Sequence, residues 1–311
     1  MNPRDFSAPV PAGGYAWWYV DAVSDDGRSG LTVIAFVGSV FSPYYSFARR
    51  RGPVDPERHC AVNVVLYGER GRRWTMTERG ASHLHRTATS FALGPSTLAW
   101  DGDALVIDID ERAAPLPRRV RGRVRVHPGT PTDATFHLDA ERRHRWSPIA
   151  PCARVEVRFD QPALAWAGDG YFDSNAGSVP LEDSFDHWTW SRAPLRDGAA
   201  ILYDVRRRDG SVQNLSLRVG RDGRVADYAA PAACPLPGTR WGIARATRAE
   251  TPGGTRLRTT LTDAPFYARS LLDTRIDGEP VIAMHEALSM RRFVAPWVQA
   301  MLPFRMPRAL R

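Results

Sequence analysis

Lysine is absent from this chain of 311 residues, so that all 42 basic side chains are arginines. The absence excludes Schiff-base chemistry, which needs a lysine amine, and the phosphate-binding loop that depends on a lysine. Cysteine is scarce as well. Cys60, Cys152 and Cys234 stand far apart, and their number and spacing exclude a disulfide framework and a zinc site.

Long apolar runs are also missing. No stretch of about 18 apolar residues occurs, as a membrane-spanning helix would require, and the first residues lack the apolar segment of a signal peptide. We therefore expect a cytoplasmic protein. The net charge of +8 suits an anionic partner. Because no helix-turn-helix, zinc-finger or RNP-type pattern is present, we expect a membrane surface rather than nucleic acid.

Motifs that bind metals or cofactors are not found either. His83 and His85 would share one face of a strand, but no third ligand follows nearby, so surface histidines are the simpler interpretation. Neither a GxSxG nor a GxGxxG motif occurs. We expect no metal and no cofactor, and any catalysis would use side chains and water.

Period-two alternation of apolar and polar residues dominates what is present, and it predicts β-strands. Asp-Gly pairs such as Asp101-Gly102, Asp197-Gly198 and Asp277-Gly278 lie between or beside these segments and are typical of hairpin turns. In 118–128 the arginines alternate with valines, which predicts arginines outside and valines inside. The predicted class is all-β, of barrel or sandwich type, and the predicted strands are 31–41, 59–68, 73–80, 104–112, 118–128, 153–160, 199–210 and 255–263.

One unit of aromatic strand, Asp-Gly turn and apolar strand occurs twice, starting at Trp17 and at Trp188. Glycines follow ten residues after each tryptophan, and leucines follow after fourteen. The repeat predicts two related β-barrel domains, residues 1–165 and 166–311, although chance similarity of two hairpins is the alternative. Nothing acidic in the first copy matches Asp204, whose counterpart is Val33.

Asp204 lies within an apolar strand, and alternation places it with Leu202 and Arg206, opposite Tyr203. It is either a solvated surface group or a buried carboxyl that stays protonated and can act as an acid. Asp173 and Asn175 form a second polar pair beside aromatic residues. The paired tryptophans at each strand start are more often core residues than ligand contacts.

Several ordered segments together resemble the bacterial carotenoid 1,2-hydratases, also called hydroxyneurosporene synthases. The resemblance covers roughly residues 14 to 290, and its segments are YAWWYVDAVSDDG (15–27), FVGSVFSPYY (36–45), RWTMTERG (73–80), SPIAPCARVEVRF (147–159), GYFDSNAG (170–177), WTWSRA (188–193), LYDV (202–205) and DAPFYARSLL (263–272). It implies two lipocalin-like antiparallel barrels followed by a short helical or irregular tail. It also implies a hydro-lyase of photosynthetic bacteria that adds water to the terminal 1,2 double bond of acyclic carotenes such as neurosporene and lycopene.

The resemblance assigns candidate roles to residues of this chain. It makes Asp204 the proton donor, while Asp173 and Asn175 hold water or orient the reactants. Tyr203, Trp188 and Trp190 would contact the cation or the substrate, and Tyr171, Trp17 and Trp18 would complete the substrate contacts. The role of His187 stays open, as does the oligomeric state.

A carotene must leave a membrane, and residues 293–311 combine large apolar side chains with arginines. Pro296, Pro303 and Pro307 prevent one long helix, so we expect short turns or one brief helix that rests on anionic lipid of the inner membrane. A tail that is docked on the protein or frayed is the alternative. A polyene cyclase of the same superfamily and a pigment carrier are the other functions that remain open.

Overall fold

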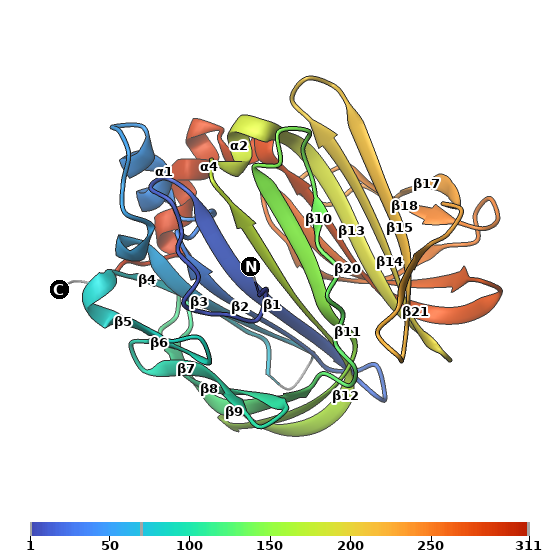
Figure 1. Ribbon diagram of the computed structural model, residues 1–311, viewed down its shortest axis with the longest axis horizontal. Coiled ribbons are helices and arrows are strands. Elements are labelled where there is room, and N and C mark those ends of the chain that lie inside the picture. The colour runs from blue at the N-terminus through green and yellow to red at the C-terminus, as the bar shows by residue number, and fades with distance from the viewer. Residues whose placement is uncertain (1, 69–70, 310–311) are drawn as a thin grey trace. The chain divides into compact units, whose positions relative to one another are not determined.

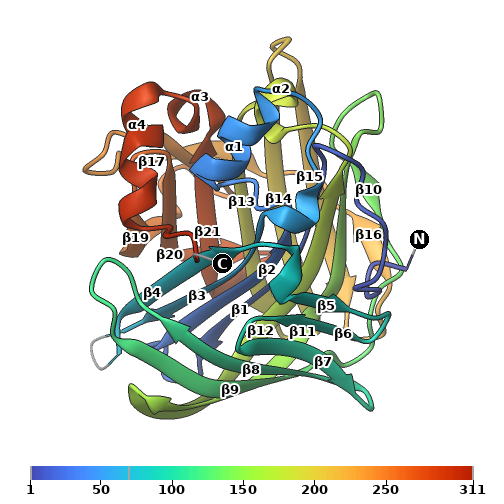
Figure 2. The same cartoon turned by 90° about the vertical axis from the view of Figure 1, so that its left-hand side faces the viewer.

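The computed structural model of the protein describes residues 2–68 and 71–309, which form mainly antiparallel β-strands (Figures 1 and 2). The predicted all-β class is confirmed. Contacts divide the chain into two compact units, Met1–Pro180 with Ala300–Arg311, and Leu181–Gln299. This division differs from the predicted boundary between residues 165 and 166. That boundary falls inside the strand Ala163–Gly177, which pairs along its length with strands of the first unit.

The first unit contains one sheet of twelve strands that curls into a nearly closed barrel. Its strands are β1 (Tyr15–Ser24), β2 (Gly30–Val37), β3 (Cys60–Tyr67), β4 (Arg73–Arg79), β5 (Leu84–Arg86), β6 (Ser90–Leu93), β7 (Ser96–Asp101), β8 (Ala104–Arg112), β9 (Arg119–His127), β10 (Phe136–His137), β11 (His144–Gln161) and β12 (Ala163–Gly177). They are paired in the order β4-β3-β2-β1-β12-β11-β9-β8-β7-β6-β5, with β10 beside β11.

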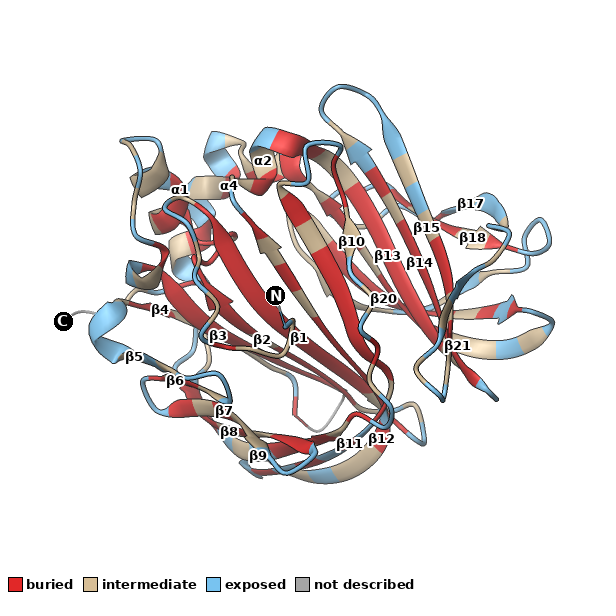
Figure 3. Ribbon diagram, in the orientation of Figure 1, coloured by how far each residue is buried: buried red, intermediate tan, exposed pale blue. Residues whose placement is uncertain are grey.

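Alternation along the strands builds the barrel core. Figure 3 shows that buried residues dominate β1, β2 and β3. On β9 the valines Val120 and Val124 are fully buried in the core, whereas Arg119 and Arg121 are exposed, as predicted. Apolar burial of this kind stabilises a fold by about 25 cal/mol for each Å² removed from water.

The edge strand β4 is covered by the last described residues of the chain. The Glu78 amide donates to the Pro307 carbonyl over 2.9 Å, and the Ala309 amide donates to the Glu78 carbonyl over 2.8 Å. The Arg308 guanidinium contacts the buried Glu78 carboxylate. These bonds dock residues 307–309 on the barrel, which is the alternative that the sequence left open for the tail.

The second unit is built on a seven-stranded antiparallel sheet and a two-stranded hairpin. Its strands are β13 (Phe185–Leu195), β14 (Gly198–Arg207), β15 (Val212–Gly220), β16 (Val225–Asp227), β17 (Ala232–Leu236), β18 (Arg245–Ala249), β19 (Arg256–Asp263), β20 (Tyr267–Ile276) and β21 (Glu279–Ser289). The sheet runs β16-β15-β14-β13-β21-β20-β19, and β17 pairs with β18. Leu236 of the hairpin packs with Ala193, Ala200 and Leu272, so the hairpin covers the inner face of this sheet.

The two segments that repeat in the sequence occupy equivalent places in the two sheets. In the first unit β1 pairs with β2 and with β12, the last strand before the boundary. In the second unit β13 pairs with β14 and with β21, again the last strand. The similarity of the two segments therefore extends from residue spacing to strand topology.

Helices are few and short. They are α1 (Pro43–Arg49), α2 (Leu181–Ser184), α3 (Met290–Phe293) and α4 (Pro296–Met301), with single 3₁₀ turns η1 (Pro56–Arg58), η2 (Ala81–His83) and η3 (Leu302–Phe304). The prolines divide the tail into short helices, as predicted. Within the described ranges, none of these helices has the length and apolar character needed to cross a membrane.

Candidate active site

Three neighbouring strands of the first unit carry polar and aromatic residues on the face opposite the barrel core. Even-numbered residues of β1, such as Trp18 and Val20, lie in the core, so the odd-numbered residues lie on the other face. Strand register aligns these residues with partners on β12 and β11 in successive rows. The rows are Tyr15–Gly177–His144, Trp17–Asn175–Trp146, Tyr19–Asp173 and Asp21–Tyr171.

Asp173 is the centre of this face. Its side chain is buried, and three side chains donate hydrogen bonds to it. Trp146 Nε1 and Tyr171 Oη donate to Oδ2 over 2.8 and 2.9 Å, and Asn175 Nδ2 donates to Oδ1 over 3.3 Å. Donors that converge on one buried carboxyl stabilise its ionised form at the moment a proton leaves.

A second carboxyl lies on the adjacent strand. Asp21 is fully buried, and Tyr19 Oη donates to its Oδ2 over 2.8 Å. The rings of Tyr19 and Tyr171 meet edge to face with centroids 6.0 Å apart. Burial raises the pKa of Tyr171 well above its usual value, so this phenol remains protonated and can donate throughout the neutral range.

His144 lies in the row of Tyr15 and Gly177, next to the row that contains Asn175. Its Nδ1 shares a hydrogen bond of 2.8 Å with Tyr15 Oη, and burial lowers the pKa of His144 to about 4, so the ring is neutral near pH 7. Gly177 lies between these two residues on β12. A Cβ at that position would lie 2.5 Å from the Tyr15 ring and 2.8 Å from His144 Nδ1. The glycine therefore makes room for the contact between Tyr15 and His144.

Aromatic rings line this face. Tyr15 and Trp17 stack with centroids 4.9 Å apart, and Trp17 also contacts Phe36 at 6.0 Å. Phe136 packs against Trp146 at 5.5 Å. Such a surface offers several π faces, which attract a cation electrostatically.

The structure brings together four of the predicted site residues on this face, namely Asp173, Tyr171, Asn175 and Trp17. Trp18 does not join them. It points into the barrel core, where its ring contacts Phe6 at 4.9 Å. Alternation is the reason, because neighbouring residues of a strand face opposite sides.

Asp204 lies in the second unit, on the face that meets the hairpin β17–β18. Arg248 Nε and Nη2 donate to its carboxylate over 2.9 and 2.7 Å, and Asn214 Nδ2 donates over 2.7 Å. The Asp204 side chain is 26% exposed. Asp204 thus forms an ion pair with Arg248, and an ion pair requires the charged carboxylate. A proton donor must instead be the neutral acid.

The other nominated residues of the second unit lie on the opposite face of the same sheet. Trp190 and Tyr203 are register partners on β13 and β14, and both are buried. Trp188 is buried two residues before Trp190 and contacts Phe185 edge to face at 6.0 Å. His187 is half-buried on the hairpin-facing side with Thr189, and burial lowers its pKa.

Sequence reasoning missed His144, Trp146, Tyr19 and Asp21. The signal is weak but present, because HRW at 144–146, at the start of β11, and YVD at 19–21, in the middle of β1, place polar and aromatic residues two apart. As for metals, residues 2–68 and 71–309 contain no group of three or more His, Cys, Asp or Glu side chains that could hold an ion.

Comparison with known proteins identifies relatives along most of the chain. Residues 33–311 match a family model described as carotenoid hydratase CrtC. The chain is 53% identical over 308 residues to an acyclic carotenoid 1,2-hydratase of Thiocapsa roseopersicina, which covers 99% of this chain and 76% of that protein. It is 41% identical over 279 residues to an enzyme of the same name from Cereibacter sphaeroides, covering 89% and 98% of the two chains.

Two solved structures share the fold at low sequence identity. The protein NE1406 of Nitrosomonas europaea aligns with a TM-score of 0.59 at 15% identity and covers 89% of this chain and 92% of its own. Kievitone hydratase of Nectria haematococca aligns with a TM-score of 0.52 at 9% identity over 93% and 98% of the chains. At such identities the likeness concerns the fold alone.

Proposed function

The chain belongs to the carotenoid hydratase family, and from this premise we propose that the Asp173 face of β1, β11 and β12 is its active site. The protein is a carotenoid 1,2-hydratase that acts on an acyclic carotene. The reaction adds water across the terminal double bond. A hydrogen becomes bound to C-2 and a hydroxyl to C-1, which gives a tertiary alcohol.

The observation that carries the proposal is the buried carboxyl of Asp173 with three donors around it. An isolated alkene is a weak base, so its protonation needs a desolvated acid held against the double bond. Burial favours the neutral carboxyl before the reaction. As the proton moves to C-2, hydrogen bonds from Trp146, Tyr171 and Asn175 stabilise the carboxylate that forms.

Proton transfer to C-2 leaves a tertiary cation at C-1. Aromatic faces stabilise such a charge by about 0.5–2 kcal/mol each when they are desolvated. Trp17, Tyr19 and Trp146 supply rings on the same face as Asp173. Water then bonds to C-1, and the carboxylate of Asp173 accepts the proton that water releases, which restores the neutral acid.

The sequence suggests Asp204 as the proton donor, but the contacts of Asp204 favour a different role. Its carboxylate is paired with Arg248, an arrangement that uses the ionised form. We propose that this ion pair fastens β18 to β14 rather than supplying the proton. The two hypotheses make opposite predictions for matched substitutions.

The test compares Asp173→Asn with Asp204→Asn in a lycopene hydration assay. Loss of a general acid lowers kcat by about 100-fold or more, which we expect for Asp173→Asn. Asp204→Asn should keep kcat within about three-fold and lower the free energy of unfolding by about 1–3 kcal/mol, because Arg248 loses its partner. A folded Asp204→Asn protein without activity, beside an active Asp173→Asn protein, would reverse the assignment.

We also propose that the second unit contacts lipid during substrate uptake. Trp241 and Trp297 stack with centroids 6.0 Å apart, and they are 41% and 43% exposed. Arg292 contacts the Trp241 carbonyl and lies over the Trp297 ring. Exposed tryptophans beside arginine suit the boundary between lipid headgroups and acyl chains. Trp241→Ser with Trp297→Ser should reduce flotation with anionic vesicles, and undiminished flotation would refute the contact.

A further inference from the structure

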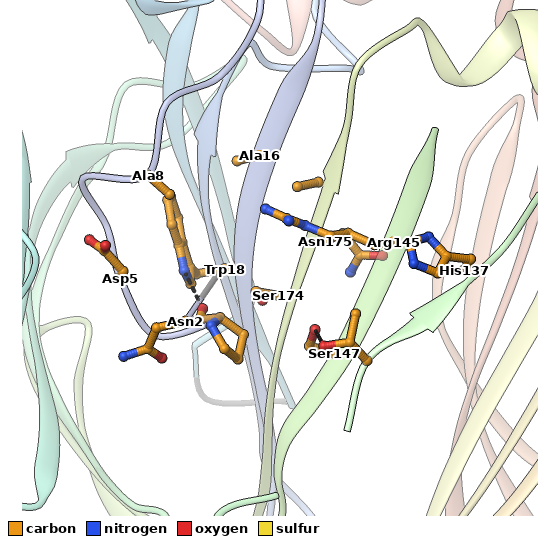
Figure 4. A pocket seen from close by; sticks show the side chains of 13 residues that line it. Asn2, Asp5, Ala8, Ala16, Trp18, His137, Arg145, Ser147, Ser174 and Asn175 are labelled. Carbon is orange, nitrogen blue, oxygen red and sulfur yellow. Dashed lines mark hydrogen bonds between the residues drawn. The ribbon is translucent and has the colours of Figure 1, made fainter. Parts of the chain in front are cut away.

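A cavity of about 250 Å³, partly open to solvent, lies in the first unit on the barrel side of β12 (Figure 4). The N-terminal segment, β1, β11 and β12 supply its wall. Polar side chains predominate among the lining residues, which are Asn2, Pro3, Asp5, Ala8, Ala16, Trp18, Thr135, His137, Arg145, Ser147, Ser174, Asn175 and Ala176.

The size and lining of this cavity suit water. One water molecule occupies about 30 Å³ of liquid, so the cavity has room for several. Each would find hydroxyl, amide, carboxylate or guanidinium partners in the wall, as an ordered water molecule requires. The apolar end of a carotene would find few matching surfaces there, because binding sites for apolar ligands are mainly apolar.

The cavity reaches the candidate active site at Asn175. This residue lines the cavity, and its Nδ2 also donates to Asp173 Oδ1 on the other face of β12. Ser147 and Ser174, which are register partners, lie in the cavity wall, and Ser174 follows Asp173 on β12 with its side chain on the opposite face of the sheet.

The sheet is irregular at this point. Between the pairs Ser147–Ser174 and Ala150–Phe172 the register of β11 and β12 shifts, so Asp173 lies opposite a bulge rather than a regular partner. The carbonyls of Pro148 and Ile149 in the bulge accept hydrogen bonds from Thr132 and so are turned out of the ladder. Bulges interrupt strand pairing and are common beside active sites.

We propose that this cavity stores the water consumed in hydration and delivers it past the β11 bulge to Asp173, with Asn175 orienting the molecule. The inference rests on the proposed role of Asp173. Protonation of C-2 does not use this water, but capture of the cation does. If water is withheld, the cation at C-1 returns a proton from C-2 or an adjacent methyl group to the Asp173 carboxylate, which reforms an alkene and restores the acid.

The experiment fills the cavity from two sides. Ala8→Leu fills it from the N-terminal segment, and Ala176→Leu fills it from β12. The matched controls are Ala8→Ser and Ala176→Ser, whose small polar side chains leave the cavity open. Each protein is incubated with lycopene in D₂O. Two quantities are measured, the rate of 1-hydroxy product formation and the deuterium content of the recovered lycopene.

We expect each leucine variant to form product at least about ten-fold more slowly, because it displaces waters whose hydrogen bonds it cannot replace. Deuterium incorporation into recovered lycopene should persist or rise, while both serine controls hydrate at the normal rate. Thermal unfolding checks that each variant is folded, and two independent filling sites keep the test open if one is not.

Three results would overturn the proposal. In the first, both leucine variants hydrate lycopene at the rate of the serine controls. In the second, they lose deuterium exchange and hydration to the same extent. In the third, only KM for lycopene rises, as expected if the cavity binds the carotene. Failure of the Asp173 assignment has a separate signature. In that case Asp173→Asn would still exchange deuterium and hydrate, whatever the filling variants do.

Discussion

Replacing Tyr171 with phenylalanine removes one hydroxyl from a fully buried side chain and leaves its ring in place. The lost hydrogen bond joins Tyr171 Oη to Asp173 Oδ2 over 2.9 Å. A bond to a neutral acceptor contributes about 1 kcal/mol, and one to a charged acceptor about 1.5–3 kcal/mol. Only the difference, about 0.5–2 kcal/mol, lowers the barrier to proton donation. We therefore expect kcat to fall roughly 2- to 30-fold.

The assay measures kcat and KM for lycopene, with Tyr45→Phe as the control. Tyr45 is also fully buried, and its hydroxyl donates over 2.6 Å to the Gly14 carbonyl, away from Asp173. Both variants should lose stability, but only Tyr171→Phe should lose kcat. Because burial raises the pKa of Tyr171 well above its usual value, the loss should not vary between about pH 6 and 9. Equal kcat for the two variants, or a change confined to KM, would refute the reasoning.

Two further predictions concern stability. Burial lowers the pKa of His285 to about 4 from its ordinary 6.5, so between these values only the unfolded chain binds the proton. The free energy of unfolding should therefore fall as pH drops from 6.5 to 4, by up to roughly 3 kcal/mol from this residue, and His285→Gln should flatten the profile in urea titrations. An unchanged profile would contradict the assignment. Gly177→Ala should cost about 1–3 kcal/mol and lower activity, because the new Cβ would lie 2.5 Å from the Tyr15 ring. Gly30→Ala, with its nearest contacts at 3.3 Å, should cost clearly less, and equal costs would count against the steric argument.

Local patterns predict much of this fold because strands and turns are local. At Asp277-Gly278 both residues adopt positive φ, 51° and 74°, as the turn between β20 and β21 requires. The alternation of arginine and valine on β9 likewise determines which side chains are buried.

The candidate site depends on contacts that no local pattern contains. Tyr15 and His144 are 129 residues apart, and their hydrogen bond also requires a glycine at 177. Arg248, the partner of Asp204, follows 44 residues later on a separate hairpin. Alternation predicts that Asp204 and Tyr203 face opposite sides, but it does not identify what each side meets.

The docking of residues 307–309 on β4 has a consequence for association between molecules. β4 ends one side of the sheet path, where free amides and carbonyls would invite a strand from another chain. At Glu78 those groups are already bonded to Pro307 and Ala309, and at Trp74 the carbonyl accepts from the Ala114 amide over 3.0 Å. The barrel thus protects its own exposed edge against intermolecular pairing. Trimming the chain before residue 305 would expose that edge and promote self-association and precipitation.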